Sequence, residues 1–208
     1  TGPVFCSGHD LKEMTAARTT ADKGHEAYQQ LFAACASVME LIVRNPKPVI
    51  AEVAGTATAA GCQLVASCDL AMASNTVKFA TPGVNLGLFC STPMVALSRN
   101  VSRKHAMEML LSGDMVDASR AEQIGLINRA FNPDQLTSET MAMALKIASK
   151  STMTIAIGKR AFYEQAEMPL NEAYAYTSQV MTENMLTRDA EEGIGAFLGK
   201  RTPEWQDQ

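Results

Sequence analysis

The sequence predicts an α/β protein that joins a largely parallel sheet to a helical C-terminal half. Between residues 48 and 80, short apolar runs rich in branched residues alternate with a helical stretch. A strand, a helix and a strand within so few residues are typical of parallel pairing, because parallel strands need a crossover connection. After residue 92 the helical spacing of apolar residues dominates. We therefore expect the sheet to lie in the first half of the chain.

The N-terminal segment predicts a strand, a turn and two helices. Residues 3–6 are expected to form a strand that meets a turn at Gly8. Nothing before this strand can pair with it, so we expect the chain to begin inside the fold. Asp10 is expected to cap a short helical turn over 11–14. Apolar residues at helical spacing predict a long amphipathic helix over 21–43.

The middle of the chain predicts the rest of the sheet. A buried strand is expected over 48–54, where branched residues follow a proline and end at a glycine. A loop is expected after Gly55, and helical periodicity restarts over 59–67. Residues 70–73 and 77–80 predict two more short strands, and a loop is expected over 81–90.

The C-terminal half is expected to be helical, with one strand-like interruption over 126–131. The predicted helices cover residues 93–100, 102–111, 118–124, 133–150, 152–166, 170–185 and 189–198. We predict a domain boundary at the interruption. Residues 1–131 would form the sheet-bearing core, and residues 132–208 a helical C-terminal region.

Composition argues against large charged partners. The chain has 208 residues and a net charge of −4, with no dense cluster of Lys and Arg. A nucleic-acid groove or a contact with an anionic membrane needs such a cluster. No apolar run approaches the roughly 20 residues that a membrane-spanning helix requires. We expect a small-molecule ligand, no nucleic acid and no membrane.

The cysteines predict buried thiols in a reducing compartment. Their number is odd, no CxxC pair occurs, and most have apolar neighbours. They are Cys6, Cys35, Cys62, Cys68 and Cys90. Neither a disulfide framework nor a metal site is expected.

Two turns suggest where chemistry takes place. One lies around Gly8, where a strand ends and a helix begins, and the other precedes Gly61, where the pattern repeats. At each turn the first amides of the following helix lack partners and carry the positive end of its dipole. Two such ends can converge on one oxygen, and each well-aimed amide stabilises a developing oxyanion by about 2.7 to 4 kcal/mol. Glycine turns before helices are also commonplace, so spacing alone leaves a purely structural interpretation open.

Four ordered motifs resemble those of one family. They read F-C-S-G-H-D-L-K-E-M, then K-P-V-I-A-E-V-A-G-T-A-T-A-A-G-C-Q-L-V-A-S-C-D-L-A-M-A-S, then F-A-T-P-G-V-N-L-G-L, and finally D-A-S-R-A-E-Q-I-G-L-I-N. Together they are similar to the crotonase, or enoyl-CoA hydratase/isomerase, superfamily. The resemblance extends from Pro3 to Trp205.

The resemblance implies a spiral of short ββα units followed by a helical C-terminal region used in trimer assembly. The partners it implies are an acyl-CoA and further copies of the chain, as a homotrimer or a dimer of trimers. CoA would be part of the substrate, and no separate cofactor is implied. The family's opening strands would precede Thr1, and their absence would leave an exposed sheet edge.

The resemblance also assigns an oxyanion hole, to the backbone amides of His9 and Ala60. Hydratases of the family place one glutamate where this chain has Gln63 and a second where it has Gly83. Other branches place an acid where this chain has Asn85 or Ser91. Each of these four residues is neutral. Residues implied to contact substrate are Ser7, Gly61, Asn85, Cys90, Ser91, Phe197 and Lys200.

Hydration of an α,β-unsaturated thioester needs one group to deprotonate water and another to protonate carbon, each worth a factor of about 10² to 10⁴. Ordinary hydratase turnover is therefore expected to fall by several orders of magnitude. Four side chains are candidates to replace the missing acid and base groups. Histidine is a common general base, so His9 can be one here, but it also suits a local hydrogen bond. Cys62 and Cys90 can be nucleophiles or small buried filler, and Glu13 can reach inward or be solvated.

Two further carboxylates have structural interpretations. Asp10 is expected to cap a helix, and Asp69 to accept hydrogen bonds from backbone amides in the core.

Two functions remain open from the sequence. The chain is either an enzyme on acyl-CoA thioesters, of the lyase or isomerase type found in fatty acid metabolism, or a non-catalytic acyl-CoA-binding protein. Bacterial cytoplasm and mitochondrial matrix are equally compatible with it.

Overall fold

The computed structural model describes residues 2–208, which divide into two compact units. The first unit runs from the N-terminus to Val43 and from Val49 to Thr140, and the second comprises Arg44–Pro48 and Met141–Gln208. The domain boundary at 131/132 is a different division of the chain and stays a prediction.

The first unit contains two small sheets. One has the strand order β1-β3-β5-β6, and the other the order β2-β4-β7. The strands are β1 (Val4–Cys6), β2 (Ile50–Val53), β3 (Thr56–Thr58), β4 (Leu70–Ser74), β5 (Lys78–Ala80), β6 (Val116–Asp117) and β7 (Arg129–Phe131). Every pairing is parallel except that of β5 with β6. The largely parallel pairing expected from the sequence is confirmed, in two sheets.

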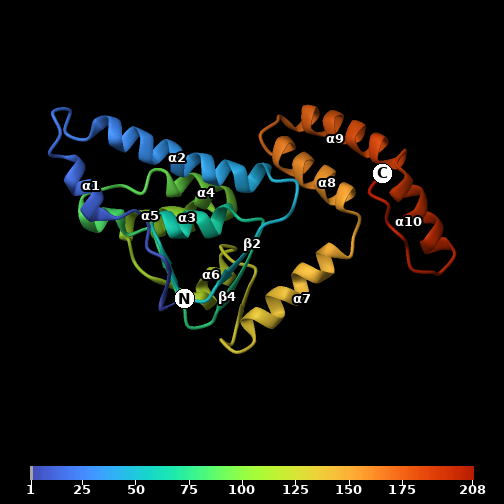
Figure 1. Cartoon of the computed structure of the whole chain (residues 1–208), viewed down its shortest axis with the longest axis horizontal. Coiled ribbons are helices and arrows are strands. Elements are labelled where there is room, and N and C mark those ends of the chain that lie inside the picture. The colour runs from blue at the N-terminus through green and yellow to red at the C-terminus, as the bar shows by residue number, and fades with distance from the viewer. Residues whose placement is uncertain (1) are drawn as a thin grey trace. The chain divides into compact units, whose positions relative to one another are not determined.

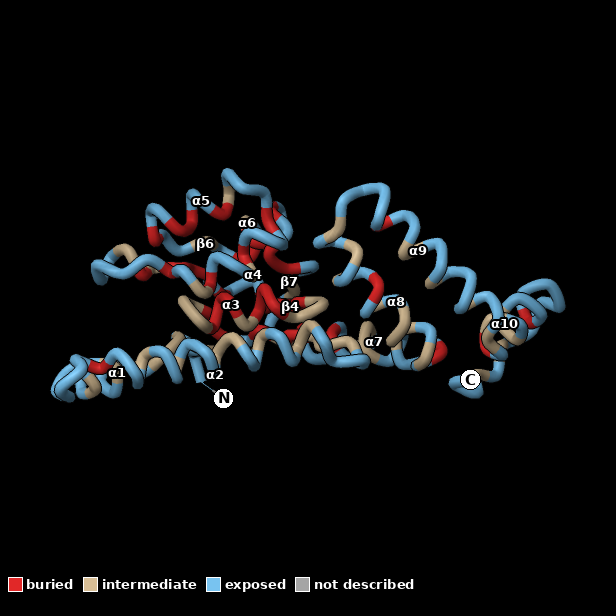
Figure 2. The backbone as a smooth tube through the Cα atoms, turned by 90° about the horizontal axis from the view of Figure 1, so that it is seen from above, coloured by how far each residue is buried: buried red, intermediate tan, exposed pale blue. Residues whose placement is uncertain are grey.

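Helices accompany these strands in the order that parallel pairing requires (Figure 1). They are α1 (Leu11–Ala17), α2 (His25–Arg44), α3 (Ala60–Ser67), α4 (Pro93–Asn100), α5 (Arg103–Ser112) and α6 (Ala118–Gln123). α2 runs alongside α3 and α4, and much of its surface is exposed (Figure 2). α1 lies at the N-terminal end of α2, a placement that matters for the site.

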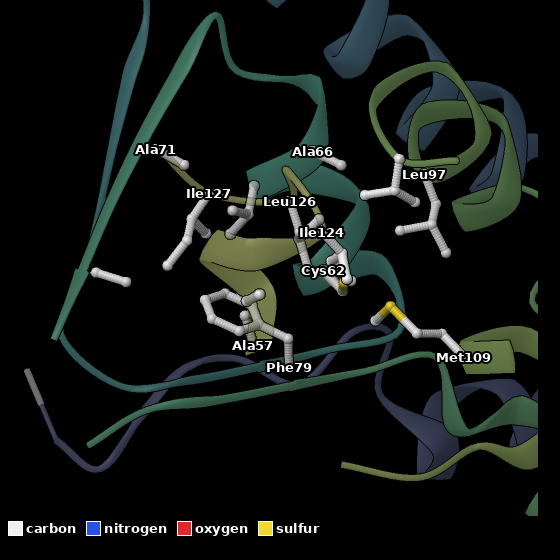
Figure 3. Close-up of a cluster of buried hydrophobic side chains, with 14 of the residues drawn as sticks. Ala57, Cys62, Ala66, Ala71, Phe79, Leu97, Met109, Ile124, Leu126 and Ile127 are labelled. Carbon is white, nitrogen blue, oxygen red and sulfur yellow. The ribbon is translucent and has the colours of Figure 1, made fainter. Parts of the chain in front are cut away.

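The core of this unit is built around α3 (Figure 3). Cys62 and Ala66 of α3 point into a cluster that also receives Ala57 and Phe79 from one sheet and Ala71 from the other. Phe79 and Ala57 are fully buried. Small residues on α3 let both sheets approach it closely, which fixes the start of this helix relative to β1 and β3.

Three elements of this unit were not predicted. β3 was predicted as loop, because three residues after Gly55 are too few to show strand alternation. β6 has only two residues and was missed for the same reason. The predicted loop over 81–90 begins with a 3₁₀ helix, η1 (Pro82–Leu86), which starts at a proline and ends at Gly87 with a positive φ of 72°.

The second unit is helical. It contains the end of α7 (Leu136–Ala148), then α8 (Thr152–Gln165), α9 (Leu170–Met185) and α10 (Arg188–Leu198). These bounds match the predicted helices closely, and α9 matches residue for residue. α8 packs against α9.

The chain after α10 folds back within this unit. The indole Nε1 of Trp205 donates to the carbonyl oxygen of Ser149 at 2.9 Å. The buried carboxylate of Asp189 accepts hydrogen bonds from the amides of Gln206 and Asp207. Hydrogen bonds with the Ser151 hydroxyl and with these amides lower the pKa of Asp189.

No helix within residues 2–208 is both long and apolar enough to cross a bilayer. No group of three or more His, Cys, Asp or Glu side chains in the same residues is placed to hold a metal ion.

Candidate functional site

The two turns predicted to carry the chemistry meet in the structure. Gly8, between β1 and α1, has a φ of +97°, a conformation that favours glycine. A Cβ built on Gly8 would lie 3.3 Å from the amide nitrogen of Ala60 and 3.1 Å from the Cβ of Ala59. The Gly8–His9 peptide therefore lies beside the N-terminus of α3.

Gly61 makes this approach possible. A Cβ at Gly61 would lie 2.0 Å from the carbonyl oxygen of Cys6, well inside contact distance. β1 therefore runs directly over the first turn of α3, and only glycine fits between them. The amide of Ala59 donates to the carbonyl oxygen of Ala80 at 3.0 Å, which ties the same turn to β5.

Ala59 precedes α3 in a backbone conformation that is rare for a residue with a side chain. Its φ is 52° and its ψ is −121°. Such a conformation costs about 1 to 3 kcal/mol and persists only where the surrounding structure holds it. The close contacts of Gly8 and Gly61 supply that constraint.

The amides of His9 and Ala60 donate no hydrogen bond to any other group within residues 2–208. Ala60 is the first residue of α3, so its amide carries part of the positive end of the helix dipole. Both residues line the same cavity. An oxyanion hole at these amides is consistent with this placement and remains a prediction.

The cavity has a volume of about 490 Å³, within the range of small-molecule sites. Its wall comes from the turn between β1 and α1, from α1 and α2, from the start of α3 and from the segment from η1 to α4. The apolar lining residues are Leu11, Met14, Phe32, Ala59, Ala60, Pro82, Gly83, Leu86, Leu88, Phe89, Cys90 and Pro93. The polar ones are Ser7, His9, Thr15, Arg18, Tyr28, Ser91 and Thr92. The described lining thus contains no Asp or Glu.

His9 is one of the residues that line this cavity, and its side chain packs on α2. Its ring meets the Phe32 ring edge-on, with centroids 5.7 Å apart. Its Nε2 atom is buried and has no hydrogen-bond partner among the described residues. The local hydrogen bond considered from the sequence is therefore not made at Nε2.

Neither position of the family glutamates offers an acid. Gln63 is buried with 5% exposure in α3, outside the described lining, and the Sγ of Cys35 is 3.9 Å from its Oε1. Gly83 is in the wall, but a Cβ there would lie 2.8 Å from the carbonyl oxygen of Leu88 and 2.9 Å from the Sγ of Cys90. The loop after η1 occupies the space that a glutamate side chain would need.

Of Asn85 and Ser91, where other branches of the family place an acid, only Ser91 is in the described lining. Ser91 is in the wall, and its hydroxyl donates to the carbonyl oxygen of Phe89 at 3.4 Å. The Asn85 side chain instead donates to the carbonyl oxygen of Gly113 at 3.5 Å, outside the described lining. Ser7 lines the cavity, and its carbonyl oxygen accepts a hydrogen bond from Thr58.

Cys62 and Cys90 were each predicted to be either a nucleophile or a small buried side chain. Burial, with a smaller contribution from Cys90, raises the pKa of the Cys62 thiol to about 12. A thiol that stays protonated is a poor nucleophile, so Cys62 is a buried side chain that packs in the core. Cys90 is also buried, and it lines the cavity.

Carboxylates near the site have structural roles. Asp10 caps α1 by accepting from the amides of Lys12 and Glu13, and Asp69 accepts from the amide of Val49 at 2.7 Å. Glu13 is exposed. The interpretations of Asp10 and Asp69 are confirmed.

Two residues assigned to substrate by resemblance lie in the second unit. Phe197, near the end of α10, is 83% exposed, and Lys200 lies beyond that helix with a φ of +52°. Neighbouring Arg201 forms a two-pronged ion pair with Glu192. Their role toward substrate stays a prediction.

Sequence reasoning missed the part of the wall that α1 and α2 supply. Thr15 and Arg18 lie beyond the turn predicted over 11–14, because α1 continues to Ala17. Tyr28 of α2 was also missed. The signal that could have found the first two is their spacing of four and seven residues from Leu11, along one helix face.

The chain matches the family model described as Enoyl-CoA hydratase/isomerase over residues 1–208. It is 52% identical over 204 residues to the Mus musculus enoyl-CoA hydratase domain-containing protein 3, mitochondrial. That match covers 98% of this chain and 66% of the relative, so the chain spans slightly less than two thirds of the relative's length.

Solved structures agree with this match. A crystal structure of enoyl-CoA hydratase from Mycobacterium smegmatis is 52% identical, with a TM-score of 0.93, and the match covers 99% of this chain and 78% of that one. The crystal structure of human enoyl-CoA hydratase domain-containing protein 3 is 51% identical, with a TM-score of 0.92, over 99% and 79% of the two chains. The α/β fold with short parallel strands and many helices is thus that of the crotonase structures.

Proposed function

Because the chain belongs to the enoyl-CoA hydratase/isomerase family, we propose that it binds an acyl-CoA thioester and does not catalyse ordinary enoyl-CoA hydration. The absence of any carboxylate from the described cavity lining carries this proposal. In it, the thioester carbonyl lies at the amides of His9 and Ala60, and the acyl group fills the apolar part of the cavity.

Binding is supported by the backbone. An amide is present whatever the side chain, so Ala60 can donate as a glycine would. The dipole of α3 favours negative charge at its N-terminus, and the apolar wall strengthens a hydrogen bond to a polarised carbonyl. Enolate stabilisation therefore remains chemically available at this site.

Hydration is disfavoured by the side chains. Adding water requires a base for the water and an acid for the α-carbon, each worth a factor of about 10² to 10⁴. The buried Gln63 amide cannot accept a proton from water, and Gly83 has no side chain. Hydratase turnover should fall by roughly the product of the two factors, about 10⁴-fold or more.

His9 favours a second candidate function, the exchange or shift of an α-proton. His9 is one of the residues that line the cavity, and its buried Nε2 atom has no hydrogen-bond partner among the described residues. A neutral imidazole there can remove a proton from the α-carbon while the two amides stabilise the enolate. One base suffices for this reaction, whereas hydration needs two groups.

Calorimetry and an absorbance assay test the main proposal. Binding of butyryl-CoA should exceed that of its thioether analogue, butyl-CoA, by about tenfold, because only the thioester has a carbonyl for the two amides. Crotonyl-CoA should bind without hydration. Equal affinity for thioester and thioether would count against the oxyanion hole, and hydration at the rate of an active hydratase would overturn the proposal.

Proton exchange in D₂O tests the second candidate. Deuterium should enter the α-position of butyryl-CoA in the presence of the protein, and His9→Gln should abolish this while leaving binding intact. His25→Gln, on the exposed start of α2, is the matched control. Exchange that survives His9→Gln would remove His9 from the chemistry.

Assembly and compartment belong to the same proposal. Several large apolar side chains of the second unit are exposed, and we expect a homotrimer or a dimer of trimers to cover them. They include Leu170, Leu186, Phe197 and Leu198. Light scattering after size-exclusion chromatography measures the state directly. The mouse relative is named as mitochondrial, and other relatives are bacterial, so both compartments stay open.

A further inference from the structure

The cavity extends along one face of α1. Leu11, Met14, Thr15 and Arg18 all line it, at the spacing of a single helix face. Arg18 is the C-cap residue and keeps helical angles, so it lies about 10 Å along the axis from Leu11. The proposed oxyanion hole is at the start of this helix, and Arg18 is therefore at the opposite end.

The Arg18 guanidinium has no partner within residues 2–208. No hydrogen bond or ion pair joins its side chain to a described group, and no carboxylate lines the cavity. Asp22 is the nearest acid after Arg18 in the sequence, but its carboxylate accepts hydrogen bonds from Thr20 and from the amides of Gly24 and Glu26. Arg18 is exposed, and no acid among the described residues neutralises its charge.

The hydroxyl donors near Arg18 are already engaged. Thr15 donates to the carbonyl oxygen of Leu11, and Tyr28 to that of Met14, each at 2.7 Å. Phe32, on the facing helix, is apolar. A polar ligand group at this end of the cavity would therefore find its hydrogen-bond donors on Arg18, whose planar fork fits a carboxylate.

We propose that Arg18 binds a carboxylate at the far end of the acyl group, so that the ligand class is the CoA thioester of a dicarboxylic acid. This inference rests on the proposed function. An extended chain advances about 3.5 Å for every three bonds, so about nine bonds span 10 Å, and fewer suffice because the arginine side chain reaches back. Medium-length dicarboxylic acyl groups match this span.

The other anions of such a ligand are the CoA phosphates. They lie beyond the pantetheine arm, which is longer than the span from the hole to Arg18, so the acyl carboxylate is the better match. The two sources are separated by testing CoA alone.

Calorimetry with three ligands tests the inference. Adipyl-CoA and hexanoyl-CoA have acyl groups of equal length and differ in the terminal carboxylate, while free CoA has no acyl group. In Arg18→Gln the affinity for adipyl-CoA should fall about tenfold, the size expected for a charged hydrogen bond, with hexanoyl-CoA and CoA unchanged. Lys23→Gln, an exposed position outside the described lining, removes the same charge and should change none of the three.

Each other outcome has one meaning. An equal loss for all three ligands in Arg18→Gln would place Arg18 at the CoA phosphates and overturn the inference. Unchanged affinity for adipyl-CoA in Arg18→Gln would also overturn the inference. Binding of hexanoyl-CoA would at the same time support the proposed function. Failure of the unaltered protein to bind hexanoyl-CoA would overturn the proposed function itself.

Discussion

The Sγ atom of Cys35, on α2, lies 3.9 Å from the Oε1 atom of Gln63, on α3. The amide that replaces a family glutamate is therefore buried beside a thiol. Burial, followed by the effect of Cys6, raises the pKa of the Cys35 thiol. No cation is part of this contact, so a carboxylate introduced at residue 63 would have no ion-pair partner there.

Gln63→Glu should therefore destabilise the fold in a pH-dependent manner. Burial should raise the pKa of the new carboxyl above its unfolded value of about 4.3, so the unfolded state loses its proton first as pH rises. Each unit of this shift costs about 1.4 kcal/mol once the pH exceeds the folded pKa. Urea unfolding at pH 5 and pH 8 measures the difference. Gln123→Glu, exposed at the end of α6, should show little dependence, and an equally flat result for Gln63→Glu would contradict the burial argument.

Gly83→Ala should destabilise the fold by about 1 to 3 kcal/mol, because its methyl group would lie too close to the Leu88 carbonyl and the Cys90 sulfur. Gly83→Glu should be worse, so restoring this glutamate is not a simple route to hydratase activity. Gly158→Ala is the control, since nothing lies near a Cβ in the middle of α8, and it should stabilise by about 0.4 to 1 kcal/mol. Thermal unfolding of the three variants tests these signs. An unchanged or raised Tm for Gly83→Ala would show that the loop moves freely.

Ala59→Gly should stabilise the fold, unlike most alanine-to-glycine changes. The positive φ of Ala59 is strained for alanine and relaxed for glycine, and relief should outweigh the extra chain entropy by about 1 kcal/mol. Ala66→Gly, inside α3, should lose stability by about 1 kcal/mol or more. Guanidinium unfolding compares the two directly. Destabilisation of both variants would mean that the turn before α3 carries no strain.

Acid should release the chain that follows α10. Arg201 and the amide of Glu204 lower the pKa of Glu192 from 4.5 to about 2. A carboxylate with a lowered folded pKa contributes stability above its unfolded pKa and loses it as pH falls toward the folded value, here between about 4.5 and 2. The sole tryptophan, Trp205, lies in this segment against Gly193 and reports its release by fluorescence.

The matching variant is Glu192→Gln, whose tryptophan emission at pH 7 should resemble that of the released segment. Glu172→Gln, exposed near the start of α9, should leave the emission and its pH profile unchanged. If Glu192→Gln kept the unaltered emission from pH 7 to pH 2, the ion pair with Arg201 would not hold the segment.

Patterns longer than about one helical turn or one full strand could be predicted from the sequence. The predicted long helix became α2, and α4 and α9 match residue for residue, because apolar periodicity over eight or more residues is unambiguous. β3 could not be predicted, since its three residues are defined by pairing with β1 and β5 rather than by any pattern of their own.

The site divides in a similar way. His9 and Ala60 were predicted by resemblance, and the structure brings their turns together. That Gly83 is blocked by Leu88 and Cys90, and that Arg18 lies in the same wall, depends on contacts across the fold. Such contacts leave no local trace in the sequence.

The contact between Gly61 and the Cys6 carbonyl oxygen sets the separation of β1 and α3 through main-chain atoms, leaving side chains aside. The backbone therefore sets the space available to a ligand oxygen between the two free amides. Acid and base catalysis, by contrast, requires particular side chains. Carbonyl recognition and proton transfer are thus separable by mutation, and a lineage can lose or exchange its chemistry while its ligand continues to be held by the same two peptide groups.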